Sequence, residues 1–401
     1  MRKILQVSIA GWIAFCVACD NPTESKYNPY EQHAIDWPSL ADSPWPMYHG
    51  NPMGNGLSFS PGPTKGQIKW SYTPGFTPGG TGLAIDSAGN VYTTLMNGNL
   101  ISLTPDGRLN WNVKLTNYPP AFSKNGVCCP MILKTGQIVV IEKDSIFIVN
   151  SGGYIEKAVK LPNNFQDASF QIDKTGNFYT VLSDGSLLSI DRNLNTRWNI
   201  FAEEGSFGGY STSHIPVFLP SGQMLVVPGT RNIYGISTQG DILWQQPCNE
   251  ITQVIVDCLG NIYYHTASDS LIIARNSEGK LRWKLKYPVK MKYYSRPTIA
   301  PTGWIIFAAS NLLWVSPDGE NIKISEYLSL NYLNMNSELV CDLSGTVYST
   351  VSGYGIYASS INEPSQWKIE QAINACIAPA VAIGILYFLD WNVGGKIYAV
   401  E

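Results

Sequence analysis

A short phrase recurs eight times along this chain of 401 residues. It consists of an apolar run, a polar turn, a glycine and two apolar or aromatic positions, as in LAIDSAGNVY and VIVDCLGNIY. The period matches the length of one four-stranded propeller blade, and such units are stable only when they stack on their neighbours. Successive glycines are 38 to 47 residues apart: Gly89, Gly136, Gly176, Gly222, Gly260, Gly303, Gly345 and Gly384.

A tryptophan provides a second marker in five of the repeats. It follows the glycine by 22 or 23 residues, at Trp111, Trp198, Trp244, Trp283 and Trp367. Turn pairs such as Asn97-Gly98 separate short alternating runs between the two markers, which predicts four short strands in each period. We expect these tryptophans to pack between blades. The second and sixth repeats lack one, near Ala158 and Ser325, so we expect their packing to differ.

The two ends of the chain complement each other. The eighth repeat stops at Glu401, before its tryptophan strand, while GQIKWSYT at 66–73 has the character of that missing strand and contains Trp70. The sequence therefore predicts an all-β fold, an eight-bladed β-propeller of four-stranded antiparallel blades. An N-terminal strand completes the C-terminal blade, so the ring buries both faces of each sheet and leaves no open edge.

The odd repeats share an aspartate three residues before the glycine, followed six residues later by a tyrosine. The aspartates are Asp86, Asp173, Asp257 and Asp342. We expect each to cap its turn by accepting hydrogen bonds from nearby backbone N–H groups. A calcium site is the other interpretation, but each aspartate is alone in its turn and a calcium ion needs about six oxygen ligands.

The charge of the sequence and the positions of its histidines argue against a nucleic-acid partner and against a bound metal. The formal net charge is −3 and only 14% of residues are charged, so we expect no nucleic-acid partner. The four histidines, at 33, 49, 214 and 265, lack the spacing of metal ligands, and no metal is expected.

The N-terminus has the pattern of an export signal. Arg2 and Lys3 precede an apolar run that ends at Val17-Ala18-Cys19, and this run is short for a membrane span. The pattern resembles a bacterial lipoprotein signal over residues 1–19, which implies lipidation of Cys19, although Cys16 stands where that pattern has leucine. An ordinary cleaved signal peptide and an uncleaved anchor are the alternatives. All three place the protein outside the cytoplasm, lipid-anchored in the bacterial envelope under the first, and we expect 20–43 to be an extended, poorly packed tether.

The repeats resemble the PQQ-like β-propeller family over residues 44–401. DSAGNVY…NGNLISLTPDGRLNW at 86–111 and DKTGNFY…DGSLLSIDRNLNTRW at 173–198 carry the resemblance, with SPWPMYHGNPMGNG at 43–56 before them. This family includes quinoprotein dehydrogenases, which hold pyrroloquinoline quinone on the propeller axis, and cofactor-free envelope lipoproteins. The resemblance therefore implies the fold more specifically than the function.

The strongest indication of chemistry is the adjacent pair Cys128-Cys129. Quinoprotein alcohol dehydrogenases carry such a pair as a disulfide facing the cofactor, so a vicinal disulfide and pyrroloquinoline quinone with calcium belong to an oxidoreductase alternative. The chain is short for that class and has no heme-attachment sequence. We therefore expect no cofactor, and sequence alone does not assign disulfide pairs.

Long connections between blades offer candidate binding residues. Those at 117–130, 201–216 and 287–297 are expected on the axial face, where rigid scaffolds commonly carry function. The candidates are Phe207, Tyr210, His214, Tyr293, Tyr294 and Arg296. Plugging of the central channel is the alternative role for these side chains.

Three hypotheses follow. The first is a non-catalytic, membrane-anchored lipoprotein that binds protein or glycan partners in the envelope, as a monomer within a larger complex. The second is the quinone-dependent oxidoreductase. The third is a propeller lyase or hydrolase acting on a polymer, for which His214 is the evident acid–base candidate.

Overall fold

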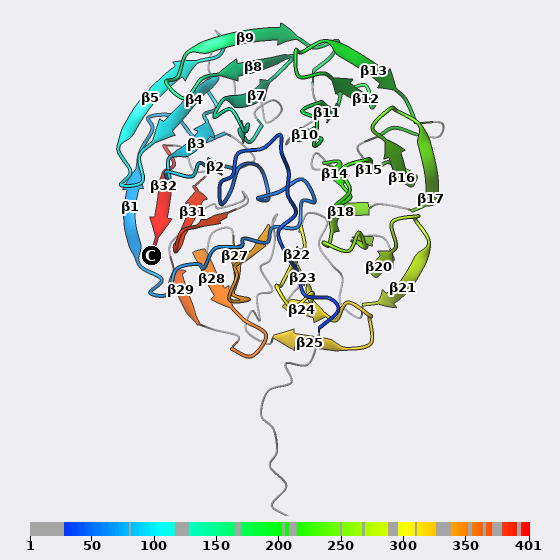
Figure 1. The fold of residues 1–401 in the computed structure, drawn as a ribbon. Helices are drawn as coiled ribbons and strands as arrows, with labels where there is room; N and C mark the ends of the chain where they lie inside the picture. Colours follow the sequence, from blue (N-terminus) through cyan, green and yellow to red (C-terminus); the bar gives the residue numbers. More distant parts are fainter. Residues whose placement is uncertain are drawn as a thin grey trace, which may run out of the picture.

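The chain folds into a ring of β-sheets (Figure 1). A computed structural model describes residues 28–79, 82–116, 128–164, 170–202, 205–207, 215–248, 251–266, 269–287, 296–308, 311–325, 338–351, 355–363, 366–370, 379–390 and 394–401. These residues form eight four-stranded antiparallel sheets, and none of the described segments is a helix able to cross a membrane. The predicted eight-bladed, all-β propeller is confirmed.

In seven blades the strand at the axis has two or three residues, whereas that of blade 5 has six, and the outermost strand of every blade has four to six residues. Blade 1 is β2 (Ala84–Ile85), β3 (Val91–Thr94), β4 (Asn99–Leu103) and β5 (Leu109–Lys114). Blades 2 to 4 are β6 (Met131–Ile132), β7 (Ile138–Glu142), β8 (Ser145–Val149), β9 (Ile155–Lys160), β10 (Gln171–Ile172), β11 (Phe178–Val181), β12 (Leu187–Ile190), β13 (Thr196–Ile200), β14 (Val217–Phe218), β15 (Met224–Pro228), β16 (Asn232–Ser237) and β17 (Ile242–Pro247). Blades 5 to 7 are β18 (Ile251–Val256), β19 (Ile262–Thr266), β20 (Leu271–Arg275), β21 (Leu281–Lys286), β22 (Thr298–Ile299), β23 (Ile305–Ala308), β24 (Leu312–Val315), β25 (Ile322–Ser325), β26 (Leu339–Cys341), β27 (Val347–Val351), β28 (Gly355–Ser359) and β29 (Trp367–Glu370).

Blade 8 joins the two ends of the chain. It contains β30 (Ala380–Ala382), β31 (Ile385–Leu389), β32 (Ile397–Val400) and, as its outer strand, β1 (Ile68–Tyr72). Trp70 pairs with Ala399 and Ser71 with Tyr398 in an antiparallel register. The predicted closure is confirmed.

The aspartates of the odd blades cap the turns between the first and second strands. Asp173 Oδ1 accepts hydrogen bonds from the N–H groups of Thr175 and Asn177, both at 2.9 Å, while its Oδ2 accepts one from the Tyr179 hydroxyl at 2.7 Å. The other three aspartates bind the tyrosine six residues later in the same way. These contacts confirm the predicted capping role and explain why the two residue types recur together.

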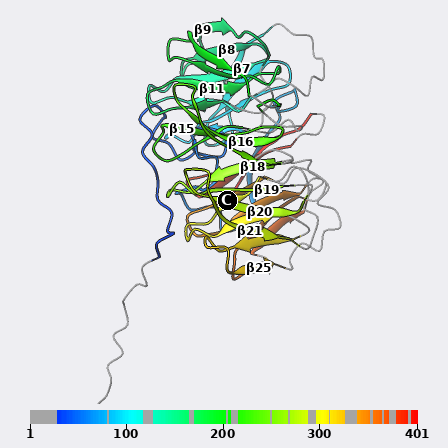
Figure 2. The same ribbon diagram turned by 90° about the vertical axis from the view of Figure 1, so that its right-hand side faces the viewer.

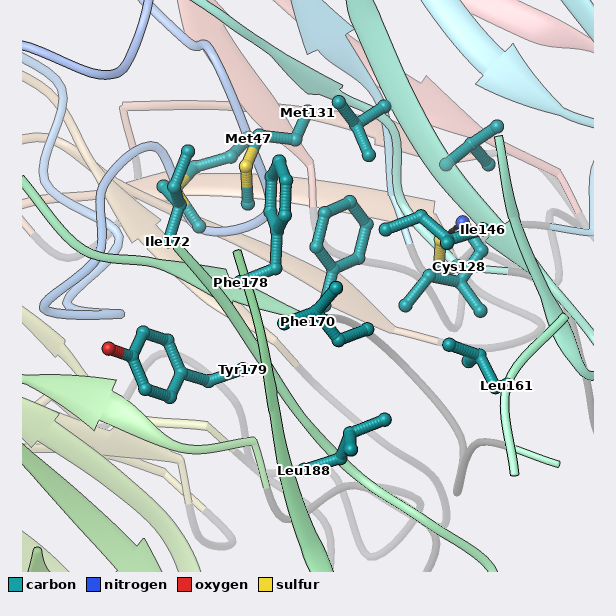
Figure 3. Packing of buried hydrophobic residues seen from close by; sticks show 14 of the residues in the cluster. Met47, Cys128, Met131, Ile146, Leu161, Phe170, Ile172, Phe178, Tyr179 and Leu188 are labelled. Atoms are coloured by element: carbon teal, nitrogen blue, oxygen red, sulfur yellow. Dashed lines mark hydrogen bonds between the residues drawn. The ribbon is translucent and has the colours of Figure 1, made fainter. Parts of the chain in front are cut away.

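The space between blades is filled by aliphatic and aromatic side chains. Figure 3 shows Met131, Ile146, Phe170 and Phe178 of blades 2 and 3 together in one buried cluster, with Met47 from the N-terminal part of the chain beside them. Inter-blade packing of this kind is what closes the ring, because a single sheet cannot bury both of its faces.

Residues 28–63, here called the N-terminal segment, lie along one face of the ring (Figure 2). The expectation that 20–43 is a poorly packed tether is wrong for its described part, 28–43, since Trp37 and Leu40 are buried. The reason is that the innermost strands have free backbone groups that need partners, and only an added segment can supply them near the axis.

The N-terminal segment bonds to all eight blades. In six of them the last residue of the innermost strand donates its backbone N–H to a carbonyl of the segment: Ile85 to Trp45, Ile132 to Pro46, Phe218 to Pro52, Val256 to Met53, Ile299 to Asn55 and Cys341 to Gly56. In blades 3 and 8 the segment is the donor, through Trp37 Nε1 to Ile172 O and Ser58 Oγ to Val381 O. The segment thus ties the inner edges of the ring together.

Candidate functional site

Polar side chains of several blades meet at the axis. They occupy one register position, seven residues before the marker glycine, where the innermost strand of each blade begins. The residues there are Gly82, Cys129, Ile215, Gln253, Arg296 and Glu338 in the six blades whose position is described. Tyr48 and His49 of the N-terminal segment insert among them, and we call Tyr48, His49, Cys129, Gln253, Arg296 and Glu338 the axial cluster.

Glu338 connects blade 7 to the N-terminal segment. Its carboxylate accepts a hydrogen bond from the Tyr48 hydroxyl at 2.5 Å and lies 3.2 Å from His49 Nε2. Because a carboxylate only accepts, Nε2 carries the proton. Burial lowers the pKa of His49 to about 4, so the ring is neutral at pH 7 and the contact is a hydrogen bond rather than an ion pair.

Of the two predicted face residues that the structure describes, Arg296 is the one that lies at the axis. Its side chain is fully buried, with Nε donating to Gln253 Oε1 at 3.1 Å and the guanidinium 4.8 Å from the centre of the Tyr48 ring. Among the described atoms, its Nη1 has no hydrogen-bond partner. Because the Arg296 guanidinium is buried between the Gln253 amide and the Tyr48 ring, it holds these two side chains in place and offers no exposed charge to a ligand.

Cys128 and Cys129 are both in the thiol form, so the vicinal disulfide allowed by the sequence is not formed in this structure. Their side chains belong to different clusters. Cys128 packs between blades 2 and 3, where its sulfur accepts the Ile141 N–H at 2.9 Å, and Cys129 packs against Tyr48 and Ile215. Burial raises the pKa of both thiols, which keeps them protonated.

The other predicted face residues do not form a described site. Phe207 is fully buried and packs edge-to-face on Tyr234 at 5.1 Å, so its expected place on an open face is wrong. Its backbone N–H donates to Gly185 O of blade 3 and it forms a bridge with Gly229 of blade 4, so it lies at the boundary between these two blades. Tyr210, His214, Tyr293 and Tyr294 lie outside the described residues, as does Cys19.

Sequence reasoning missed Tyr48, Gln253 and Glu338. A usable signal existed, because counting back seven residues from each marker glycine finds every inner-strand member of the cluster. Tyr48 and His49 had no such signal, since they lie outside the repeats and reach the axis only through the path of the N-terminal segment.

A hollow of about 670 Å³ opens on the face covered by the N-terminal segment. The lining of this hollow is both apolar and charged. Its apolar surface includes Trp37, Phe59 and Ile383, and its charged residues are Asp36, Asp42 and Lys134. The Ser43 hydroxyl, also in the lining, is buried and has no hydrogen-bond partner among the described atoms. The hollow is separate from the axial cluster, none of whose residues line it.

The axial cluster does not fit a quinone held by a metal ion. Glu338 is its only carboxylate and already accepts from Tyr48 and His49. Within the described part of the chain, no group of three or more histidine, cysteine, aspartate or glutamate side chains is arranged to hold a metal ion. The described axis therefore lacks the acidic ligand set that calcium or a lanthanide requires.

No protein family and no curated protein sequence matches this chain. Among solved structures it is similar to BamB from Moraxella catarrhalis, at 11% identity and a TM-score of 0.62 over 84% of this chain and 97% of that one. A europium-containing methanol dehydrogenase is similar at 11% identity and a TM-score of 0.66, over 90% and 98%. Virginiamycin B lyase from Staphylococcus aureus is similar at 14% identity and a TM-score of 0.50, over 84% and 98%.

The class defined by these findings is the eight-bladed propeller. More particularly, the chain has the PQQ-like propeller fold found in BamB and in the methanol dehydrogenase. Identities this low establish the fold and leave the function to the residues of the site.

Proposed function

We propose that this protein is a lipid-anchored lipoprotein of the bacterial envelope whose propeller is a non-catalytic platform for protein or glycan partners. The observation that carries this proposal is the N-terminal segment, which bonds to the inner edge of every blade and closes one mouth of the ring. A ring locked in this way is a rigid support, and rigid supports suit recognition by the loops that they display.

The chemistry of the axial cluster supports the same proposal. Tyr48, His49 and Arg296 are buried, and the polar contacts of Glu338 hold the N-terminal segment in place. A general acid or base must reach a substrate proton and titrate near the working pH. His49, with a pKa of about 4 and its Nε2 proton directed at Glu338, meets neither requirement at pH 7.

The similar structures include BamB, a methanol dehydrogenase and a lyase, so the fold alone favours none of the three hypotheses. The oxidoreductase is less well supported, because the described axis does not fit a quinone with its metal. The polymer lyase or hydrolase rested on His214, which is outside the described residues. The platform needs no reacting group.

The platform has a defined direction. The N-terminal segment lies on the face that carries the turns between first and second strands, as its bonds to Lys134 and Leu343 show. The outer strands end and the inner strands begin at the opposite face, because the four strands of each blade alternate in direction. If Cys19 is lipidated, this opposite face points away from the membrane, and we place the partner there.

Cross-linking in intact cells followed by purification from membranes tests this function. We expect a defined envelope protein or glycan, recovered in constant ratio from full-length protein. It should be lost when residues 288–295 are replaced by a Gly-Ser linker that leaves the buried Tyr287 and Arg296 in place. The control replaces Ser277 and Glu278, which are exposed in a turn on the other face, and leaves Gly279 in place. Turnover of an alcohol or sugar after reconstitution with pyrroloquinoline quinone and calcium would overturn the proposal. Cys19→Ala should release the protein from membranes, and continued attachment would contradict the lipid anchor.

A further inference from the structure

An exposed apolar rim borders the hollow on the face of the N-terminal segment. It consists of Phe59, Leu343 and Ile383, which are 37%, 48% and 59% exposed. The segments that carry these residues lie side by side, because Ser60 O accepts the Leu343 N–H and Pro61 O accepts the Gly384 N–H. Phe59 and Ile383 also share the lining of the hollow.

Ile383 occupies a backbone conformation that does not suit it. It forms a two-residue turn with Gly384, and its φ is +52°, in the left-handed region. Such turns favour asparagine, aspartate or glycine, and a β-branched residue there is strained. Since the side chain is mostly exposed, packing inside the protein does not account for an isoleucine at this position.

The described chain begins on the same face as this rim. Asn28 Nδ2 donates to Thr302 O at 3.0 Å, and the Gln32 N–H donates to Pro301 O at 2.7 Å, both in the first turn of blade 6. Cys19 is nine residues before Asn28, a span of at most about 30 Å when fully extended. A lipid on Cys19 would therefore keep this face close to the bilayer.

We propose that the rim of Phe59, Leu343 and Ile383 rests on the lipid surface and sets the orientation of the propeller. This inference depends on the lipid anchor of the proposed function. Three partly exposed apolar side chains suit shallow insertion among headgroups, which buries apolar area without crossing the bilayer. The carboxylates of Asp36 and Asp42, which line the hollow behind the rim, stay in water and limit the depth.

Photo-cross-linking in native membranes tests this orientation on the full-length protein. Benzoylphenylalanine is placed at Phe59 or Ile383, and matched controls carry it at Leu243 of β17 or Ile324 of β25, which are 55% and 50% exposed on outer strands. After irradiation, mass spectrometry identifies what is attached to each peptide. We expect phospholipid adducts about tenfold more often at positions 59 and 383 than at the controls, as insertion at the interface requires.

Two outcomes would overturn the inference: adducts to protein alone at 59 and 383, or lipid adducts as frequent at the controls. Failure of the anchor is distinguishable, because the protein would then not sediment with membranes at all. Ile383→Asn is a second variant that should still fold, because asparagine suits the left-handed conformation of this turn. It should raise the melting temperature while lowering lipid adducts at position 59, and an unchanged adduct yield would count against the rim.

Discussion

Trp244 of blade 4 lies over Gly279 in the outer turn of blade 5, and its Nε1 donates to Ser277 O at 3.1 Å. A Cβ on Gly279 would come within 2.6 Å of the indole ring, so the close approach requires glycine. The same relationship recurs at five further boundaries: Trp70–Gly107, Trp111–Gly153, Trp198–Gly240, Trp283–Gly319 and Trp367–Gly66. These contacts confirm that the tryptophans pack between blades.

The two boundaries without a tryptophan also lack the glycine. By register the tryptophan position of blade 2 is Lys157 rather than Ala158, since Lys157 pairs with Ile148 as Trp111 pairs with Ser102. The outer turn of blade 3 carries Leu194, with a φ of +64°, where six blades have glycine. In blade 6 the same position is Lys323 rather than Ser325, and the outer turn of blade 7 at 360–366 contains no glycine. At these two boundaries the tryptophan and the turn glycine are therefore absent together. Leu194 is buried and fills the boundary between blades 2 and 3.

Gly279→Ala should destabilise the protein through two additive causes. A left-handed alanine costs about 1 kcal/mol, and the clash with Trp244 adds about 1 to 2 kcal/mol. Gly136→Ala is the matched control, because Gly136 has a φ of +81° with nothing within 4 Å of the added Cβ. Urea unfolding of both variants should separate the two causes. Equal losses of unfolding free energy in the two variants would show that the contact with the Trp244 indole ring does not affect stability.

Tyr48→Phe should weaken the attachment of the N-terminal segment to blade 7. The hydroxyl donates to the Glu338 carboxylate in a buried setting, so its loss is expected to cost about 1 to 3 kcal/mol. Tyr154→Phe, at a residue that is 73% exposed, is the control and should be neutral. Chemical unfolding followed by tryptophan fluorescence measures both, and a neutral Tyr48→Phe would contradict a structural role for the axial cluster.

Glu142 should make the protein less stable in alkaline solution. Burial raises the pKa of this carboxyl to about 7, and its Oε2 has no hydrogen-bond partner among the described atoms. Because the folded-state pKa is above the unfolded value, the favourable contribution is complete below about pH 4 and is lost as the pH rises through 7. Glu142→Gln should therefore gain about 2 kcal/mol relative to the parent at pH 8. Melting curves at pH 5 and pH 8 test this, and a gain that does not change with pH would refute it.

Ala399→Pro should open the ring at blade 8. Ala399 is in β32, between β31 and β1, where proline removes a ladder hydrogen bond at an expected cost of about 3 kcal/mol or more. Ser87→Pro is the control, because Ser87 follows Asp86 in an exposed turn where proline is tolerated. Limited proteolysis should release the N-terminal part of the Ala399→Pro variant first. Resistance equal to the control would mean that closure by β1 contributes little.

The repeat alone determined the number of blades, the strand order and the pairing of the two ends. These follow from local patterns: a glycine that permits a tight turn, an alternating strand and a tryptophan at constant distance, as in Gly260 and Trp283. Because every blade uses the same short-range rules, the fold can be read from one period and its repetition.

Only the tertiary structure decided what occupies the axis. Residues 28–43 resembled a tether because they carry no repeat, yet they supply partners to inner strands whose backbone groups have no neighbour in their own sheet. Phe207 resembled a face residue and is inter-blade core, while Glu338 gave no local sign of its contact with Tyr48, 290 residues earlier. Contacts at such separation depend on how the ring closes, and closure is a property of all eight blades together.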